Sequence, residues 1–104
     1  MESYLANAMG DSVDDVSFRD IQKAIVDIQE MDDEHGAFWV SIVDQEETVL
    51  ETHKDLLVIG MFQPSEPGDK GIRKQMRNWA EVEKLYALFL DQKFDAVKAI
   101  LSEP

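Results

Sequence analysis

Three short apolar segments follow one another in the middle of the chain, at residues 37–43, 48–53 and 56–62, with charged turns at 44–47 and 54–55 between them. In the first two segments, alternate side chains divide between two faces, which is typical of β-strands. Turns this short join neighbouring strands in antiparallel order. The pattern therefore predicts a three-stranded antiparallel meander, and it limits the fold to one built on an antiparallel sheet.

The third segment, residues 56–62, is apolar on both faces. Such a pattern is typical of a strand that is covered on both sides, so we expect it to be the central strand with the first helix packed on one face. Gly60 within this strand indicates a bulge or a close approach by another part of the chain. In the first strand, Phe38 and Val40 share one face, whereas Trp39 points to the other.

A helix is predicted over residues 18–31, because its start carries a capping box. The Ser17 side chain can accept a hydrogen bond from a backbone N–H of the first turn, and the Asp20 side chain can accept one from the backbone N–H of Ser17. Apolar residues then recur every three or four positions, which places them on one helix face: Phe18, Ile21, Ile25 and Ile28. We expect the acidic segment 32–35 to end the helix, with Gly36 supplying backbone freedom for the turn.

The C-terminal third is predicted to be mainly helical. Asn78 and Glu81 form a second capping signal, which begins a helix over residues 79–91. Residues 96–101 form a short last helix whose apolar side can pack back on the core. Ahead of both helices, residues 70–77 fit either an edge strand or a helical turn.

The first 15 residues are ambiguous, since residues 1–9 fit either a short strand or a frayed end and residues 10–15 fit a polar turn. In chain order the elements are a helix, three strands and two helices, which indicates an α+β fold. We predict a small antiparallel sheet of three or more strands, packed with an N-terminal helix and one or two C-terminal helices. A length of 104 residues fits a single domain over residues 1–104.

The composition excludes several classes of protein. There is no cysteine, so disulfide frameworks and thiolate metal sites are excluded, which fits a reducing compartment. The N-terminal residues lack the basic and apolar segments of a signal peptide, and the longest apolar runs are too short to cross a bilayer. We therefore expect a cytoplasmic protein with no membrane partner.

All of the net charge of −12 lies in the first half of the chain. Residues 1–55 contain 15 Asp and Glu against three Lys and Arg, whereas residues 56–104 contain seven of each kind. A strongly anionic surface repels nucleic acid and attracts basic partners. The charge pattern therefore disfavours nucleic-acid binding and favours a basic protein as partner.

The acidic residues gather around the predicted meander and the helix end before it. One interpretation is a solvated, highly charged face. The other is a binding surface, on which the repulsion between carboxylates is relieved when a basic partner neutralises them. The predicted partner-binding residues are these acids, His53 between two of them and Trp39 as an aromatic anchor: Asp32, Asp33, Glu34, Trp39, Asp44, Glu46, Glu47, Glu51, His53 and Asp55.

Catalytic and cofactor signals are weak. Segment 32–35 holds metal-ligand residue types, but adjacent ligands rarely converge on one ion, so a solvated helix end is the better interpretation. No Gly-rich loop precedes a helix, and we expect neither a cofactor nor a metal. His53 and Glu51 share a strand face, which suits either an acid–base pair or an exposed salt bridge. The basic residues between 70 and 74 are expected to pair with the protein's own acids.

Three segments carry a resemblance to a known family: SFRDIQKAIVDIQEM, GAFWVSIVDQEETVLETHKDLLVIGMF and NWAEVEKLYALFLDQKF. Over more than half of the chain, the order of elements and the acidic, cysteine-free composition resemble those of immunity proteins of bacterial polymorphic-toxin and contact-dependent growth-inhibition systems. The resemblance implies a cytoplasmic protein without catalytic activity, which binds a cognate toxin domain and blocks it. In that family the toxin is often a nuclease with a basic active-site cleft, and an acidic face would mimic nucleic-acid phosphates.

We therefore expect an immunity or inhibitor protein that is not an enzyme and that neutralises a basic toxin domain through its acidic surface. Two alternatives stay open. The first is an acidic adaptor or regulatory subunit that binds another basic protein. The second is a small enzyme centred on His53 and Glu51.

Overall fold

The protein consists of a six-stranded antiparallel sheet with helices on one face. This architecture confirms the predicted α+β class. The computed structural model describes residues 2–32, 36–43, 47–62 and 71–103. Within them the elements follow in this order: β1 (Glu2–Asn7), β2 (Ser12–Asp14), α1 (Phe18–Gln29), β3 (Ala37–Val43), β4 (Glu47–His53), β5 (Leu57–Met61), β6 (Ile72–Gln75), α2 (Trp79–Leu90) and α3 (Phe94–Leu101).

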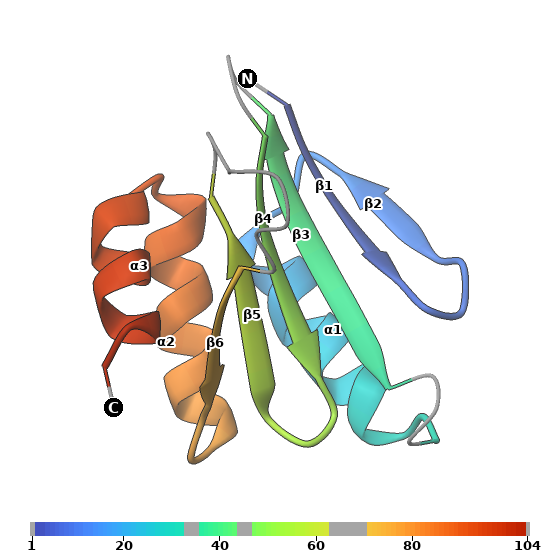
Figure 1. Cartoon of the computed structure of the whole chain (residues 1–104). Coiled ribbons are helices and arrows are strands. Elements are labelled where there is room, and N and C mark those ends of the chain that lie inside the picture. Colours follow the sequence, from blue (N-terminus) through green and yellow to red (C-terminus); the bar gives the residue numbers. More distant parts are fainter. Residues whose placement is uncertain (1, 33–35, 44–46, 63–70, 104) are drawn as a thin grey trace.

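The strands lie in the order β2-β1-β3-β4-β5-β6, and each pair of neighbours is antiparallel (Figure 1). The predicted meander is confirmed as β3, β4 and β5. The sheet is wider than predicted because a hairpin, β1–β2, adds to one side and β6 adds to the other. Between β2 and β3 the chain passes through α1, so that β1 and β3 become neighbours although they are far apart in sequence.

The ambiguous N-terminal residues form a hairpin of two strands. The predicted polar turn at residues 10–15 is wrong in part, because Ser12–Asp14 pairs with β1 as an edge strand. Two hydrogen bonds join Ser3 of β1 to the residues that follow β2. The Ser3 carbonyl accepts from the backbone N–H of Asp15 at 2.9 Å, and the Ser3 hydroxyl accepts from the backbone N–H of Val16 at 3.0 Å. Non-local pairing thus overrides the local turn signals.

The prediction that residues 56–62 form the central strand is wrong. β5 is next to the edge of the sheet, and β3 and β4 are central. Helix α3, rather than α1, packs against β5. The expected close approach at Gly60 is confirmed, because a Cβ there would lie 2.6 Å from the Leu101 side chain and 2.7 Å from that of Phe62. Residues 72–75, within the segment 70–77, form an edge strand.

Both predicted helix caps are present. Ser17 and Asp20 form a reciprocal capping box at the start of α1, and Asn78 accepts from the backbone N–H of Glu81 at 2.9 Å at the start of α2. The helix ends differ from the prediction by one or two residues. Gly36 serves a different purpose from the one predicted, because a Cβ there would lie 2.7 Å from the Lys54 Cβ. It allows the chain to pass close to the β4–β5 turn.

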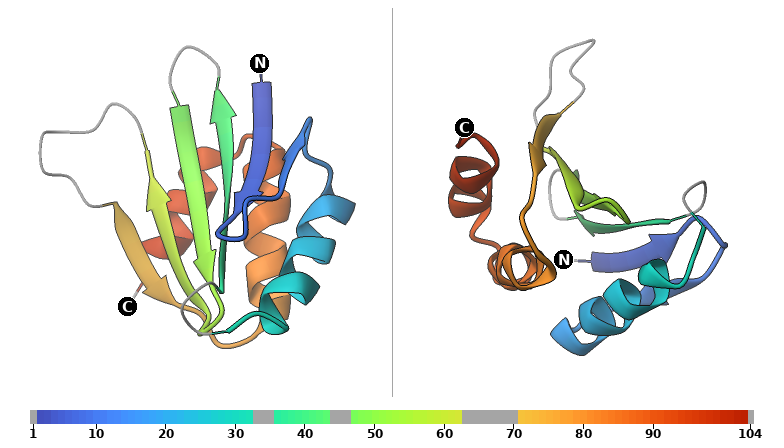
Figure 2. Two further views of the ribbon diagram at one scale, coloured as in Figure 1. Left: turned by 90° about the vertical axis from the view of Figure 1, so that its right-hand side faces the viewer. Right: turned by 90° about the horizontal axis from the view of Figure 1, so that it is seen from below.

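One apolar core lies between the helices and one face of the sheet. Its fully buried members come from β3, β4, β5, α1, α2 and α3: Phe38, Val40, Leu50, Val58, Ile21, Ile28, Val82, Leu85, Tyr86, Phe89, Val97 and Leu101. At its centre the Tyr86 hydroxyl donates to the Leu50 carbonyl at 3.1 Å and lies 2.7 Å from the Thr52 hydroxyl. All three helices lie on this side of the curved sheet, as Figure 2 shows.

Candidate functional site: the open face of the sheet

Among the described residues, no helix lies on the second face of the sheet. Because side chains alternate along a strand, every residue next to a core-facing one points to this side. We call this surface the open face and define it by its central residues and its rim acids. The central residues are Tyr4, Trp39, Ser41, Val49, Ile59 and Met61, and the rim acids are Glu2, Asp14, Glu47 and Glu51.

Strand register places Trp39 near the middle of the open face. It lies on a central strand, opposite Glu51 of β4 on one side and Ala6 of β1 on the other. Trp39 is half-buried, although none of the helices in the described part of the chain covers it. Large half-exposed aromatic side chains of this kind combine apolar area with a polar ring N–H, and they are enriched at protein interfaces.

A shallow hollow of about 280 Å³ lies beside Trp39. Its position follows from the register, because Ser41 is a small residue opposite Tyr4 on one side and Val49 on the other. The small side chain leaves space between its larger neighbours. The hollow is lined by residues from β1, β3, β4 and β5: Tyr4, Trp39, Ser41, Glu47, Val49, Glu51 and Met61.

Carboxylates surround the central residues. Glu47 and Glu51 line the hollow, and register places Glu2 and Asp14 on the same face, opposite Val43 and Tyr4. One cationic side chain, that of Arg73, is placed on this face by its register with Ile59. Among the described residues, the open face is therefore net acidic with an aromatic and aliphatic centre.

His53 and Glu51 interact directly, as their shared strand face suggested. The Nε2 atom of His53 lies 2.9 Å from a carboxylate oxygen of Glu51, and the two side chains are 37% and 28% exposed. A half-exposed contact between neighbouring side chains of one strand is a common surface interaction and adds little stability. Acid–base chemistry would need a substrate group within hydrogen-bond reach of the same pair.

Four of the predicted binding residues lie together on this side of the sheet: Trp39, Glu47, Glu51 and His53. Asp55 lies in the β4–β5 turn, where its carboxylate accepts from the backbone N–H of Leu57 at 3.1 Å. Asp32 follows the end of α1, away from the open face. The four other predicted acids fall outside the described residues: Asp33, Glu34, Asp44 and Glu46.

The N-terminal hairpin contributes residues to the open face that the sequence did not predict. Glu2, Tyr4 and Asp14 belong to the open face because β1 lies beside β3, a neighbour relationship that no local pattern encodes. One weak signal was present. Leu5 is the one strongly apolar residue in the middle of Glu2–Asn7, and its burial sends Tyr4 to the opposite face.

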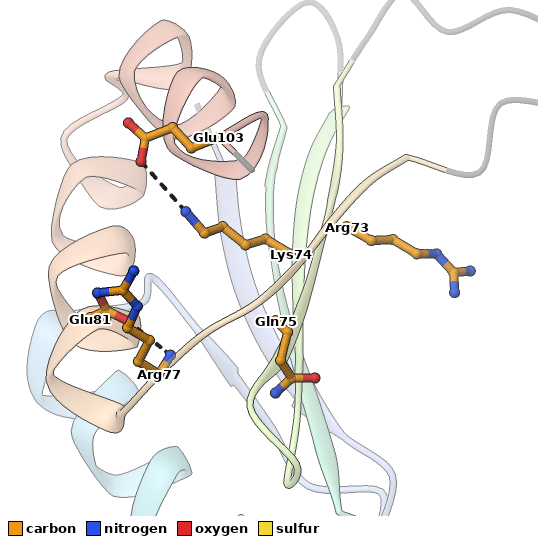
Figure 3. A pocket seen from close by; sticks show the side chains of 6 residues that line it. All are labelled: Arg73, Lys74, Gln75, Arg77, Glu81 and Glu103. Carbon is orange, nitrogen blue, oxygen red and sulfur yellow. Dashed lines mark hydrogen bonds and ion pairs between the residues drawn. The ribbon is translucent and has the colours of Figure 1, made fainter.

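A basic groove of about 460 Å³ lies at the other edge of the sheet, between β6 and the C-terminal helices (Figure 3). Lys74 reaches across it, donates to the Ile100 carbonyl at 3.2 Å and pairs with Glu103 at 3.5 Å. Glu81 accepts from the backbone N–H of Arg77 at 2.9 Å. The expectation that this basic segment pairs with the protein's own acids is confirmed for Lys74.

No protein-family model, curated protein or solved structure matches the chain significantly. In the part of the chain that the structure describes, no helix is both long and apolar enough to cross a bilayer. Among the same residues, no three His, Asp or Glu side chains are grouped in a way that could hold a metal ion. The assignment of a function therefore depends on the geometry of the open face.

Proposed function

We propose that the protein is an immunity protein, which acts in the cytoplasm by binding a basic toxin domain, such as a nuclease, through the open face. The observation that carries the proposal is Trp39, a half-buried aromatic side chain at the centre of an uncovered sheet face, with Glu51 directly across from it. At protein interfaces, central aromatic anchors ringed by polar groups carry most of the binding energy.

The charge of the molecule supports the same partner chemistry. With a net charge of −12, the protein attracts a basic surface over long range and increases the rate of encounter. At physiological salt the Debye length is about 8 Å, so charges on one face still act together. Single rim pairs add little affinity, whereas charge pairs buried on binding contribute about 1.5–7 kcal/mol.

Two other candidates use the same residues. An acidic adaptor would bind a basic protein through the open face without blocking an activity. An enzyme is favoured by one observation, the contact between His53 and Glu51 at 2.9 Å. For an enzyme, His53→Gln should abolish turnover of a substrate.

The first experiment identifies the partner and tests the surface. The wild-type protein and two variants, Trp39→Leu and Trp79→Leu, would be immobilised and incubated with extract of the source cells at low and high salt. Trp79 lies on α2 against the core, so its substitution is the matched control. We expect a basic protein that is retained by the wild type and by Trp79→Leu, is lost with Trp39→Leu and elutes at high salt. Equal retention by both variants would exclude the open face.

The second experiment separates an inhibitor from an adaptor. The captured partner would be assayed for its activity, with nuclease activity first, at increasing ratios of the protein. An immunity protein should abolish the activity at a one-to-one ratio. A partner that binds through Trp39 and keeps its full activity would establish the adaptor instead.

The kinetics of the same complex test the role of charge. One variant carries Lys in place of three open-face acids: Glu2, Glu47 and Glu51. It should associate at least about tenfold more slowly, because electrostatic steering raises association rates well above those of uncharged surfaces. The control reverses three acids of the helical side: Glu83, Asp91 and Asp95. Surface plasmon resonance at several salt concentrations measures both. Equal effects, or an association rate that does not depend on salt, would contradict electrostatic steering toward the open face.

A further inference from the structure

The hollow beside Trp39 has the size of a site for one side chain. We infer that it receives an arginine side chain of the partner, an inference that rests on the proposed function of the open face. The volume of about 280 Å³ is far larger than the roughly 30 Å³ of one water molecule. It is also at or below the lower end of ligand pockets, which span about 300–1,000 Å³.

The walls of the hollow match the two parts of an arginine. Val49 and Met61 offer apolar contact for an aliphatic stem, and Tyr4 and Trp39 bring aromatic rings into the wall of the hollow, against which a guanidinium can pack. Ser41 is 1% exposed beneath them, so the bottom of the hollow is closed by the sheet itself.

The charged wall of the hollow favours a guanidinium over an ammonium group. Glu47 and Glu51 come from the same strand, on the same face, and both line the hollow. The Glu51 carboxylate lies 2.9 Å from His53 Nε2. A planar guanidinium can bond a carboxylate with two parallel N–H groups while it stacks on an aromatic ring, which the compact ammonium group of lysine cannot do.

Short peptides test this site without the natural partner. Acetyl-Gly-Arg-Gly-amide and the matched Lys peptide would be titrated into ¹⁵N-labelled protein, and the indole N–H signals of Trp39 and Trp79 would be followed by NMR. We expect the Arg peptide to shift the Trp39 signal in a saturable manner and to leave the Trp79 signal in place. Affinity for the Lys peptide should be about fivefold lower or more, because stacking and paired bonds are lost.

Conservative variants assign the contacts. Glu51→Gln keeps the shape of the side chain and should weaken Arg-peptide binding by about tenfold, as expected for the loss of a charge-assisted hydrogen bond. Glu83→Gln, on α2, is the matched control and should leave it unchanged. Equal affinity for the two peptides, or an unshifted Trp39 signal at saturating peptide, would overturn the arginine site.

The outcome for the proposed function is measured separately. If the Arg peptide does not bind but partner capture still depends on Trp39, the open face is an interface and only the arginine assignment fails. If partner capture is also independent of Trp39, the proposed function of the open face fails as well.

Discussion

The hydrogen bonds of Tyr86 provide the sharpest test of how the sheet is joined to the helices. The side chain is fully buried and its hydroxyl has two partners, the Leu50 carbonyl at 3.1 Å and the Thr52 hydroxyl at 2.7 Å. Since a phenol has one proton and donates it to Leu50, Thr52 donates its own proton to the Tyr86 oxygen. The Tyr86 side chain of α2 thus forms hydrogen bonds with two polar groups of β4, a carbonyl and a hydroxyl.

The geometry sets the size of each effect. Tyr86→Phe removes both bonds and leaves the Thr52 hydroxyl and the Leu50 carbonyl without this partner in the core, which should lower the free energy of unfolding by about 1–3 kcal/mol. Thr52→Val removes one bond and leaves the Tyr86 hydroxyl donating to Leu50, so its cost should be about 0.5–1.5 kcal/mol. In the double variant the stranded Thr52 hydroxyl is absent. The two effects should therefore be less than additive, by about 1 kcal/mol.

Urea denaturation followed by circular dichroism measures all four proteins of this cycle. Tyr4→Phe is the matched control, because it removes the same atom from the open face and should change stability by less than about 0.5 kcal/mol. Strictly additive effects, or a Tyr86→Phe variant as stable as the wild type, would refute the inferred network. A changed dependence on urea concentration would show that the variant has altered more than these bonds.

Three further predictions concern pH and the helix ends. Burial raises the pKa of the Tyr86 phenol well above its ordinary value of about 10, so the unfolded chain loses this proton first and stability falls above about pH 10, by up to about 1.4 kcal/mol per pH unit. The stability difference between the wild type and Tyr86→Phe, measured in urea from pH 8 to 11, should therefore shrink above pH 10, and a constant difference would contradict the burial of the phenol. Gln92, which lies two residues after the end of α2, has a φ of 60°, a left-handed conformation that favours glycine, so Gln92→Gly should raise stability by about 0.5–1 kcal/mol. Lys93, the next residue, has a φ of −86°, so Lys93→Gly is the control and should bring no gain. Ser17→Ala removes the cap of α1 and should lower the thermal midpoint, at a cost of about 0.5–2 kcal/mol, so an unchanged midpoint would argue against the cap.

Local chemistry made the helices and the meander predictable. The capping box of Ser17 and Asp20 and the cap at Asn78 depend only on residues within one turn, and the structure contains both. The alternation of side chains between the two faces of β3 likewise depends only on neighbouring residues. It therefore placed Trp39 correctly on the face opposite Phe38. The contact between Glu51 and His53 followed from the same rule.

Strand order was not predictable from local chemistry. β1 pairs with β3 across the whole of α1, and nothing in residues 2–7 specifies that partner. The composition of β5 favoured a central position for a physical reason. Leu57 and Ile59 point to the open face, where Leu57 is half-buried and Ile59 is 8% exposed, while Val58 points to the core. A strand that is apolar on both sides therefore marked an apolar patch on the open face and not a central position.

The same observation gives the main argument for placing the function on the open face. An antiparallel sheet that is covered on one side normally presents polar side chains on the other. Among the described residues, the open face presents Tyr4, Trp39 and Met61 beside the carboxylates of Glu47 and Glu51. Partly exposed apolar groups and surface carboxylates do little to stabilise the isolated chain, and both gain favourable contacts when a basic, partly apolar surface covers them. In the basic groove beside β6, by contrast, Lys74 already pairs with Glu103 of the same chain.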